Sequence, residues 1–232
     1  MTHRTFADRA IAYYNALDAP DNLPPGIGVM NPYQQPDVQQ IVGEFYTKFY
    51  GDTNPRVFVL GINPGRFGAG MTGISFTTPQ NLRRYCGIEN TLRDTGTAPR
   101  PELSSRFIYQ VVDAFGGARA FYANFFLTSL FPLALTKDGK NYNFYDDRAT
   151  TGILWPAITE AVRTQTSFGA DRRVAVCLGR KNEVYLNRLN EQQNFFDRIV
   201  ALDHPRYILQ YKSKDAPQYL ERYIATLHDC LE

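Results

Sequence analysis

Hydrophobic residues recur along this chain with two different periods, and the way the periods alternate predicts the architecture. Apolar positions lie at helical spacing over residues 5–17, and again from Val38 to Phe49 after Pro36. The next segment, Arg56–Gly61, is a short apolar run typical of a strand buried on both faces. From there on, patterns typical of strands and helices follow one another in turn.

The rest of the chain extends this alternation. Further helices are predicted over 79–86, 104–115, 148–166 and 181–192 and from 215 onward, and further strands over 120–127, 174–178 and 198–202. Pro156 is expected to interrupt or restart its helix, and the Pro/Gly-rich stretch 20–32 is expected to be irregular.

Four strands separated by helices predict an α/β fold with a mainly parallel four-stranded central sheet. Helices would flank this sheet on both faces as a three-layer sandwich. We expect a single domain over residues 1–232, with 1–25 as an N-terminal helical extension.

Composition narrows the class of protein. The 232 residues include 25 Lys and Arg against 23 Asp and Glu, a net charge of +2, so wholesale electrostatic binding is not expected. No apolar run approaches the roughly 18 residues that a membrane helix needs, and the N-terminus lacks the apolar centre of a signal peptide. The three cysteines match neither a disulfide framework nor a zinc motif. These features predict a cytoplasmic protein that binds no metal and no membrane.

Ligands of parallel α/β sheets bind beyond the carboxyl ends of the strands, so the segments after each strand are the candidate site. Residues 61–76 follow the first of these strands and contain five glycines, which allow a ligand to approach the backbone closely. The spacing of those glycines fits no phosphate-binding motif. A generic turn between strand and helix would explain the segment equally well.

Two polar residues stand out near other strands. His204 follows the strand predicted over 198–202, and Asn124 lies within the apolar segment predicted as a strand over 120–127. A histidine there could simply cap backbone groups, and a buried asparagine could simply bond to a loop. Residues 172–214 carry nine Lys and Arg against four Asp and Glu, a modest local excess that suits contact with phosphates.

Gly61–Phe76 resembles the first motif of the uracil-DNA glycosylase superfamily. Its start, GINPG, also fits the mismatch-specific branch, but its continuation, with FG at 67–68 and TGISF at 72–76, is similar to the single-strand-selective monofunctional branch. Gly28–Pro32 and His204-Pro205 resemble two further motifs of that branch. The chain departs from the branch in two places. After His204-Pro205, where the branch usually continues S-P-R, this chain has Arg206-Tyr207-Ile208. The stretch from Asn124 to Pro132 is also longer than usual. The chain therefore resembles a divergent, bacterial second subfamily.

The resemblance implies a monofunctional glycosylase that excises uracil, and a few other damaged bases, from DNA. Asn63 would position the hydrolytic water and His204 would donate to uracil O2, as the catalytic pair. Phe76 would stack on the flipped base, and Asn124 would pair with its Watson–Crick edge. Ile62 and Gly65 would complete the base pocket, with Gly65 leaving room beside C5.

For DNA itself, the resemblance implies contacts from Arg206, Tyr207 and Lys212 in a loop over residues 205–212, with Arg206 filling the stack that the base leaves. The motifs place no lysine for a Schiff base, so no lyase activity is expected, and no metal or organic cofactor is needed. DNA would be the partner of a monomeric protein. Two other hypotheses stay open: a module that binds uracil or abasic DNA without turnover, and an unrelated nucleotide-binding α/β protein.

Overall fold

A four-stranded parallel sheet forms the centre of the molecule. The computed structural model describes residues 4–93 and 102–232. The sheet consists of β3 (Phe125–Ser129), β2 (Arg56–Gly61), β6 (Ala170–Leu178) and β7 (Ile199–Leu202), in that order, and every neighbouring pair is parallel. The predicted α/β class, with a mainly parallel four-stranded sheet flanked by helices, is confirmed.

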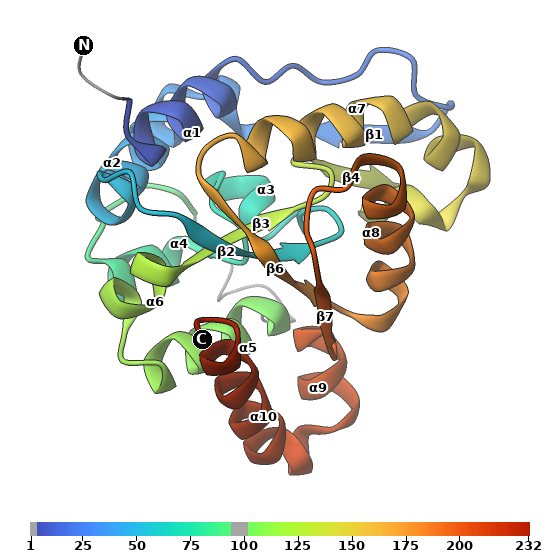
Figure 1. Ribbon diagram of the computed structural model, residues 1–232. Coiled ribbons are helices and arrows are strands. Elements are labelled where there is room, and N and C mark those ends of the chain that lie inside the picture. The colour runs from blue at the N-terminus through green and yellow to red at the C-terminus, as the bar shows by residue number, and fades with distance from the viewer. Residues whose placement is uncertain (1–3, 94–101) are drawn as a thin grey trace.

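Helices cover both faces of this sheet. Figure 1 shows α1, α2 and α7 on one side and α5, α9 and α10 on the other. The helices are α1 (Phe6–Asn15), α2 (Pro36–Tyr50), α3 (Ala69–Thr72), α4 (Pro79–Asn81), α5 (Leu103–Ala114), α6 (Ala118–Asn124), α7 (Arg148–Thr166), α8 (Arg180–Gln193), α9 (Pro205–Tyr211) and α10 (Ala216–Asp229). Within the described ranges, no helix is both long and apolar enough to cross a membrane.

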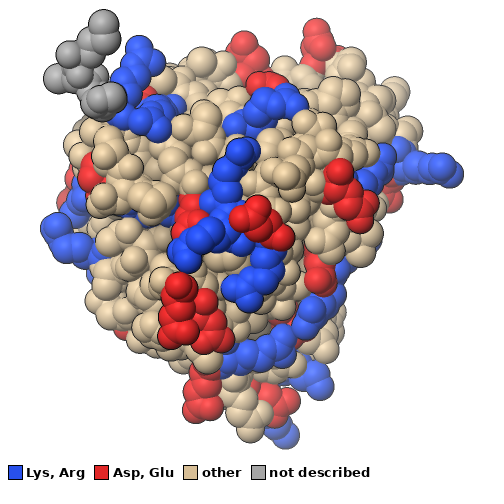
Figure 2. All heavy atoms as spheres, in the orientation of Figure 1, with Lys and Arg blue, Asp and Glu red and all other residues tan. Residues whose placement is uncertain are grey.

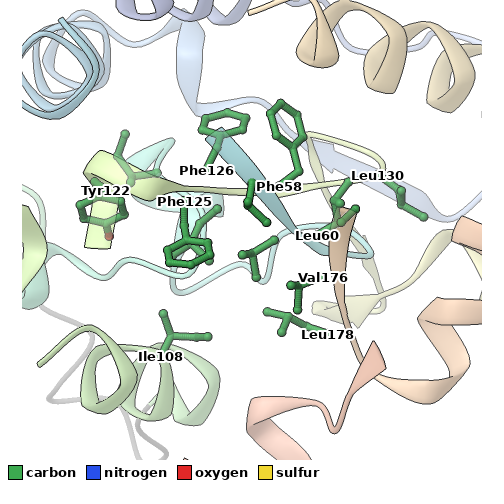
Figure 3. Close-up of a cluster of buried hydrophobic side chains, with 14 of the residues drawn as sticks. Phe58, Leu60, Ile108, Tyr122, Phe125, Phe126, Leu130, Val176 and Leu178 are labelled. Atoms are coloured by element: carbon green, nitrogen blue, oxygen red, sulfur yellow. The ribbon is translucent and has the colours of Figure 1, made fainter. Parts of the chain in front are cut away.

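Alternation along the strands sends side chains into both layers of the core. In Figure 3, Phe126 points to the side of the sheet opposite its neighbour Phe125, which faces Ile108 of α5. Phe126 packs on Phe58 of β2, with ring centroids 4.9 Å apart. All four side chains are at most 2% exposed, so truncating either β3 phenylalanine to Ala would cost about 3–5 kcal/mol.

The N-terminal helix α1 is part of this core rather than an appendage on it. Thr5 and Asp8 form a capping box that starts the helix. Phe6 is fully buried and stacks on Tyr50 of α2 at 5.1 Å, and Tyr14 stacks on Tyr33 at 4.8 Å. The predicted helix over 5–17 is confirmed, and its aromatic residues anchor it against α2.

A second, antiparallel sheet was not predicted. It contains β1 (Ile27–Met30), β4 (Ala134–Lys137) and β5 (Lys140–Tyr142), in the order β1-β4-β5. Asp138 and Gly139 turn the β4–β5 hairpin with φ of 50° and 66°, a conformation that the Asp-Gly pair favours. The irregular stretch expected over 20–32 therefore contains a short strand.

Three local predictions were wrong. Residues 120–127 are not a strand throughout: α6 runs to Asn124 and β3 begins at Phe125, because a short apolar run suits a buried helix as well as a strand. Helix α7 continues through Pro156 without a break, since its buried stripe (Leu154, Ile158 and Val162) packs on the core on both sides of that proline. The segment after His204, expected as a loop, is the helix α9.

Candidate functional site

A pocket of about 150 Å³ lies at the carboxyl end of the central sheet. The loop after β2 forms much of its wall, and β3, β5, α5 and α9 complete it. Among the residues that line it are Ile62, Asn63, Gly65, Phe76, Glu102, Ser129, Asn141, Tyr142, His204 and Arg206. Six of the predicted site residues thus lie together here, whereas Asn124, Tyr207 and Lys212 are not part of the lining.

The Asn63 amide is held at both ends by the segment that follows β5. Its Nδ2 donates to the Tyr142 carbonyl at 3.0 Å, and its Oδ1 accepts from the Phe144 backbone N–H at 3.3 Å. These two bonds fix which end of the amide is the acceptor. A carbonyl oxygen has two lone pairs, so Oδ1 can accept one further hydrogen bond, such as that of a water molecule.

Phe76 is held in a strained conformation over the end of β2. Its φ is 55°, a left-handed value that is uncommon for a residue with a large side chain. The ring lies so close to Gly61 that a Cβ on that glycine would be 2.8 Å from the Phe76 Cζ. The ring therefore forms one wall of the pocket directly beside the strand.

His204 caps the N-terminus of α9, and this fixes its tautomer. The backbone N–H of Arg206 donates to Nδ1 at 3.1 Å, so in the neutral ring the proton sits on Nε2. Burial, and then the charge of Arg206, lowers the pKa of His204 to about 4. At neutral pH the ring is thus uncharged and presents a single N–H donor.

Two polar side chains that were not predicted flank Gly65. A Cβ on Gly65 would be 3.4 Å from Nδ2 of Asn141 and 3.8 Å from Oε1 of Glu102. Burial raises the pKa of Glu102, while hydrogen bonds from Ser105 and Ser104 and the charge of Arg206 act in the opposite direction. The Asp138-Gly139 pair is a sequence signal for a hairpin turn, so it could have predicted β5, the strand that carries Asn141. No local pattern marks Glu102.

The structure corrects the prediction for Asn124. This residue ends α6 at the amino end of β3, and its amide donates back to the Ala120 carbonyl at 2.9 Å. The opposite end of β3 carries Ser129, which pairs with Gly61 and lines the pocket. Because a strand rises about 3.3 Å per residue, the two positions are roughly 15 Å apart. The misplaced strand boundary caused the error.

Helix α9 presents cationic and aromatic side chains beside the pocket. Arg206 lies in its first turn and bonds through Nε to Gln210 at 3.1 Å. Tyr207 is 42% exposed and lies 5.7 Å from the ring of Tyr211, which is 67% exposed. Lys212 follows the end of the helix, about 9 Å from Arg206 along its axis.

Positively and negatively charged side chains are mixed on the surface. Figure 2 shows Lys and Arg interspersed with Asp and Glu on the face that it presents. No lysine is among the described residues that line the pocket. The described part of the chain also holds no group of three or more His, Cys, Asp or Glu side chains that could bind a metal ion. The chemistry of the pocket therefore rests on amides, hydroxyls, one carboxyl, one imidazole and the guanidinium of Arg206.

Comparisons with known proteins agree with this geometry. The family model for the uracil DNA glycosylase superfamily matches residues 48–228. A crystal structure of wild-type SMUG2 from Pedobacter heparinus is 41% identical in sequence, covers 98% of this chain and 99% of its own, and superposes with a TM-score of 0.91. No match was found among curated proteins.

Proposed function

We propose that this chain, which belongs to the uracil-DNA glycosylase superfamily, flips uracil out of DNA and hydrolyses the bond between that base and its deoxyribose. One observation carries the proposal: Asn63 and Phe76 from the segment after β2, and His204 from the segment after β7, line a single pocket at the carboxyl end of the sheet. An amide acceptor, an aromatic face and a neutral N–H donor are the groups that such a hydrolysis requires.

Asn63 acts on the attacking water. Cleavage of the glycosidic bond leaves positive charge on the sugar and negative charge on the base. Water adds to the sugar carbon and then loses one proton to solvent, and the base departs as its anion. The free lone pair of Asn63 Oδ1 accepts a hydrogen bond from this water and holds it in place. An amide is too weak a base to deprotonate water early, so the contribution of Asn63 is orientation.

His204 acts on the departing base. Negative charge develops on uracil as the bond breaks, and a hydrogen bond from Nε2–H to O2 stabilises it. Because Nδ1 already accepts from the Arg206 backbone, the ring needs no rearrangement during the reaction. Loss of one such donor typically lowers a rate by about 10²–10³-fold.

Phe76 and Ser129 hold the flipped base. The Phe76 ring stacks on its face, a contact worth about 1–3 kcal/mol per base. Ser129 takes the polar contact that the sequence had suggested for Asn124. A hydroxyl both donates and accepts, so Ser129 does not by itself distinguish uracil from cytosine. The lower cost of flipping a mispaired or unpaired base adds selectivity.

The decisive experiment uses a labelled oligonucleotide with one uracil. Incubation with the protein followed by hot alkali should give strand cleavage at that position, and Asn63→Ala should abolish it. Omitting the alkali should leave the strand intact, because none of the described residues that line the pocket is a lysine that could carry out a lyase step. Retardation of the oligonucleotide without cleavage would instead identify the protein as a binding module.

A further inference from the structure

The side chain of Gln165 is buried between three elements of the core. It lies near the end of α7 and is 1% exposed. Its amide bonds to Thr128 and Ser129 of β3 and to Tyr14 of α1. Figure 1 shows α1 and α7 on the same side of the central sheet. Gln165 therefore connects both helices to the end of β3 that reaches the pocket.

The two ends of the Gln165 amide have different partners. Its Nε2 donates to the Ser129 backbone carbonyl at 3.2 Å. Its Oε1 accepts from the Thr128 hydroxyl, and also from the Tyr14 hydroxyl at 3.4 Å. Burial raises the pKa of Tyr14, so all of these partners are uncharged. Because an amide donates at one end only, the partners fix its orientation.

Gln165 bonds to the free edge of β3, the outermost strand of the sheet. The inner edge of β3 pairs with β2, where the Leu130 N–H donates to the Gly61 carbonyl at 3.1 Å. The carbonyl of the preceding residue, Ser129, points to the outer edge and is satisfied by Gln165 instead. The end of β3 is thus held from both sides.

The Ser129 side chain extends from this doubly held position toward the pocket. A Cβ on Gly61 would lie 3.7 Å from Ser129 Oγ and 2.8 Å from Phe76 Cζ, so the hydroxyl and the ring lie at the same end of β2. Successive side chains of a strand alternate between its faces, and the Thr128 hydroxyl accordingly points the other way, to Gln165. One glutamine behind the strand therefore holds the residue whose hydroxyl serves the pocket in front of it.

We propose that Gln165 is a positioning residue for Ser129. It acts through the Ser129 carbonyl, and it sets where the Ser129 hydroxyl meets the flipped base. This inference rests on the proposed function, in which Ser129 is the polar contact of that base. A hydrogen bond tolerates only small errors in distance and angle, so a loosened strand end weakens the contact. Through Tyr14, the N-terminal helix α1 supports the same arrangement.

A double-mutant cycle distinguishes positioning from a general structural role. Gln165→Leu removes the amide and should lower single-turnover excision of uracil by roughly tenfold, as loss of the Ser129 contact would. In a Ser129→Ala background the same substitution should have little further effect on excision, because the hydroxyl that it positions is gone. Its effect on the urea unfolding midpoint should be equal in both backgrounds, since Ser129→Ala keeps the backbone carbonyl.

Gln165→Glu provides a second test with a built-in rescue. A protonated carboxyl offers an O–H to the Ser129 carbonyl and an oxygen to Thr128, whereas an ionised carboxyl has no donor. Burial raises the pKa of such a carboxyl. Excision by this variant, relative to the wild type at the same pH, should therefore be normal at about pH 5 and roughly tenfold lower at about pH 9. In the Ser129→Ala background this dependence on pH should be absent.

Gln192→Leu is the matched control. Gln192 is exposed on α8 and, like Gln165, bonds to a different element, because its Oε1 accepts the indole N–H of Trp155 in α7 at 2.9 Å. This bond holds no residue of the pocket lining. Gln192→Leu should therefore leave uracil excision unchanged in both backgrounds.

The outcomes distinguish this inference from the proposed function. If the wild-type protein excises uracil but Gln165→Leu lowers excision equally in both backgrounds, Gln165 does not position Ser129, and the glycosylase function stands. The same holds if Gln165→Glu follows the wild type at every pH, a result that decides alone should Gln165→Leu not fold. A wild-type protein that does not excise uracil overturns the proposed function and this inference with it.

Discussion

The ring of Phe76 occupies the space that a side chain on Gly61 would need. A Cβ on Gly61 would lie 2.8 Å from Cζ and 3.2 Å from Cε2 of that ring. Gly61 ends β2, which is buried along its whole length, so this contact sets the ring against the central sheet. The unfavourable φ of Phe76 also places the ring here, because this backbone conformation turns the side chain back over the strand.

Gly61→Ala should therefore impair catalysis more than folding. The added methyl pushes the half-buried Phe76 ring aside, and excision should fall by roughly tenfold, as a lost stacking contact would predict. The ring is the far end of a flexible side chain, so we expect the unfolding free energy to fall by about 1 kcal/mol or less. Single-turnover kinetics and urea unfolding measure the two effects.

The control is Gly61→Ala in a protein that lacks the Phe76 ring. In a Phe76→Ala background, Gly61→Ala should have little further effect on excision, because there is no ring left to displace. Equal effects of Gly61→Ala in both backgrounds would show that the glycine acts through something other than Phe76.

Substitution of Ser129 should lower uracil excision, whereas substitution of Asn124 should not. Ser129→Ala removes a hydroxyl that lines the pocket and should lower uracil excision by roughly tenfold. Asn124→Ala removes an amide that bonds to the Ala120 carbonyl within α6 and lies outside the pocket lining, so it should leave excision unchanged. Both rates are read on one uracil oligonucleotide. A larger loss from Asn124→Ala would restore the original assignment and exclude Ser129 as the base contact.

The sequence predicted the parts of this molecule that depend on local patterns. The apolar run 56–61 predicted β2 to the residue, and the glycine-rich segment after it indicated the pocket loop. Three residues of the pocket were not predicted because no local pattern marks them: Glu102, Ser129 and Asn141. Each is an ordinary polar residue in its own segment and becomes part of the pocket only when α5, β3 and β5 pack around the loop.

The boundary of β3 shows how one local error propagates. Residues 120–127 are apolar apart from Asn124, and their sequence does not mark where the helix α6 ends and the strand begins. Because the predicted strand began five residues early, Asn124 was expected inside it, and the resemblance then made Asn124 the residue expected to contact the base. The packing of α6 on α2 and β2, which no local pattern contains, decides between the two.

Excision should not titrate near the usual pKa of histidine. The pKa of His204 is lowered from 6.5 to about 4, first by burial and then by Arg206, so the ring stays neutral at pH 5. We therefore expect the single-turnover rate to show no inflection near pH 6.5. A rate that falls with a midpoint at that pH in the wild-type protein, and not in His204→Gln, would show that the folded ring titrates normally.

The same shift predicts a dependence of stability on pH. An unfolded chain protonates His204 near pH 6.5, whereas the folded protein does so only near pH 4. The stability that the neutral ring contributes is thus fully present above pH 6.5 and is lost as the pH falls to about 4. Between pH 7 and pH 4 the wild-type protein should lose up to about 3 kcal/mol more unfolding free energy than His204→Gln. Equal losses would contradict the buried, neutral ring.

Arg206 should matter most when the substrate is a duplex. It lies in the first turn of α9, exposed at the pocket, with Nε held by Gln210 at 3.1 Å. Only in a duplex must a side chain fill the stack that the flipped base leaves, so Arg206→Ala should lower excision from double strands by roughly tenfold and from single strands much less. Parallel single-turnover assays on the two substrates give the ratio directly.

Lys212 supplies the matched control, since it carries the same charge about 9 Å farther along α9. Lys212→Ala should weaken binding to single and double strands to a similar extent, and more so at low salt, as expected for a phosphate contact. If Arg206→Ala shows this same pattern, with equal losses on both substrates, the guanidinium contacts a phosphate and does not enter the stack. A selective loss on duplexes that persists at high salt identifies Arg206 as the intercalating side chain, because stacking depends far less on ionic strength than a phosphate contact does.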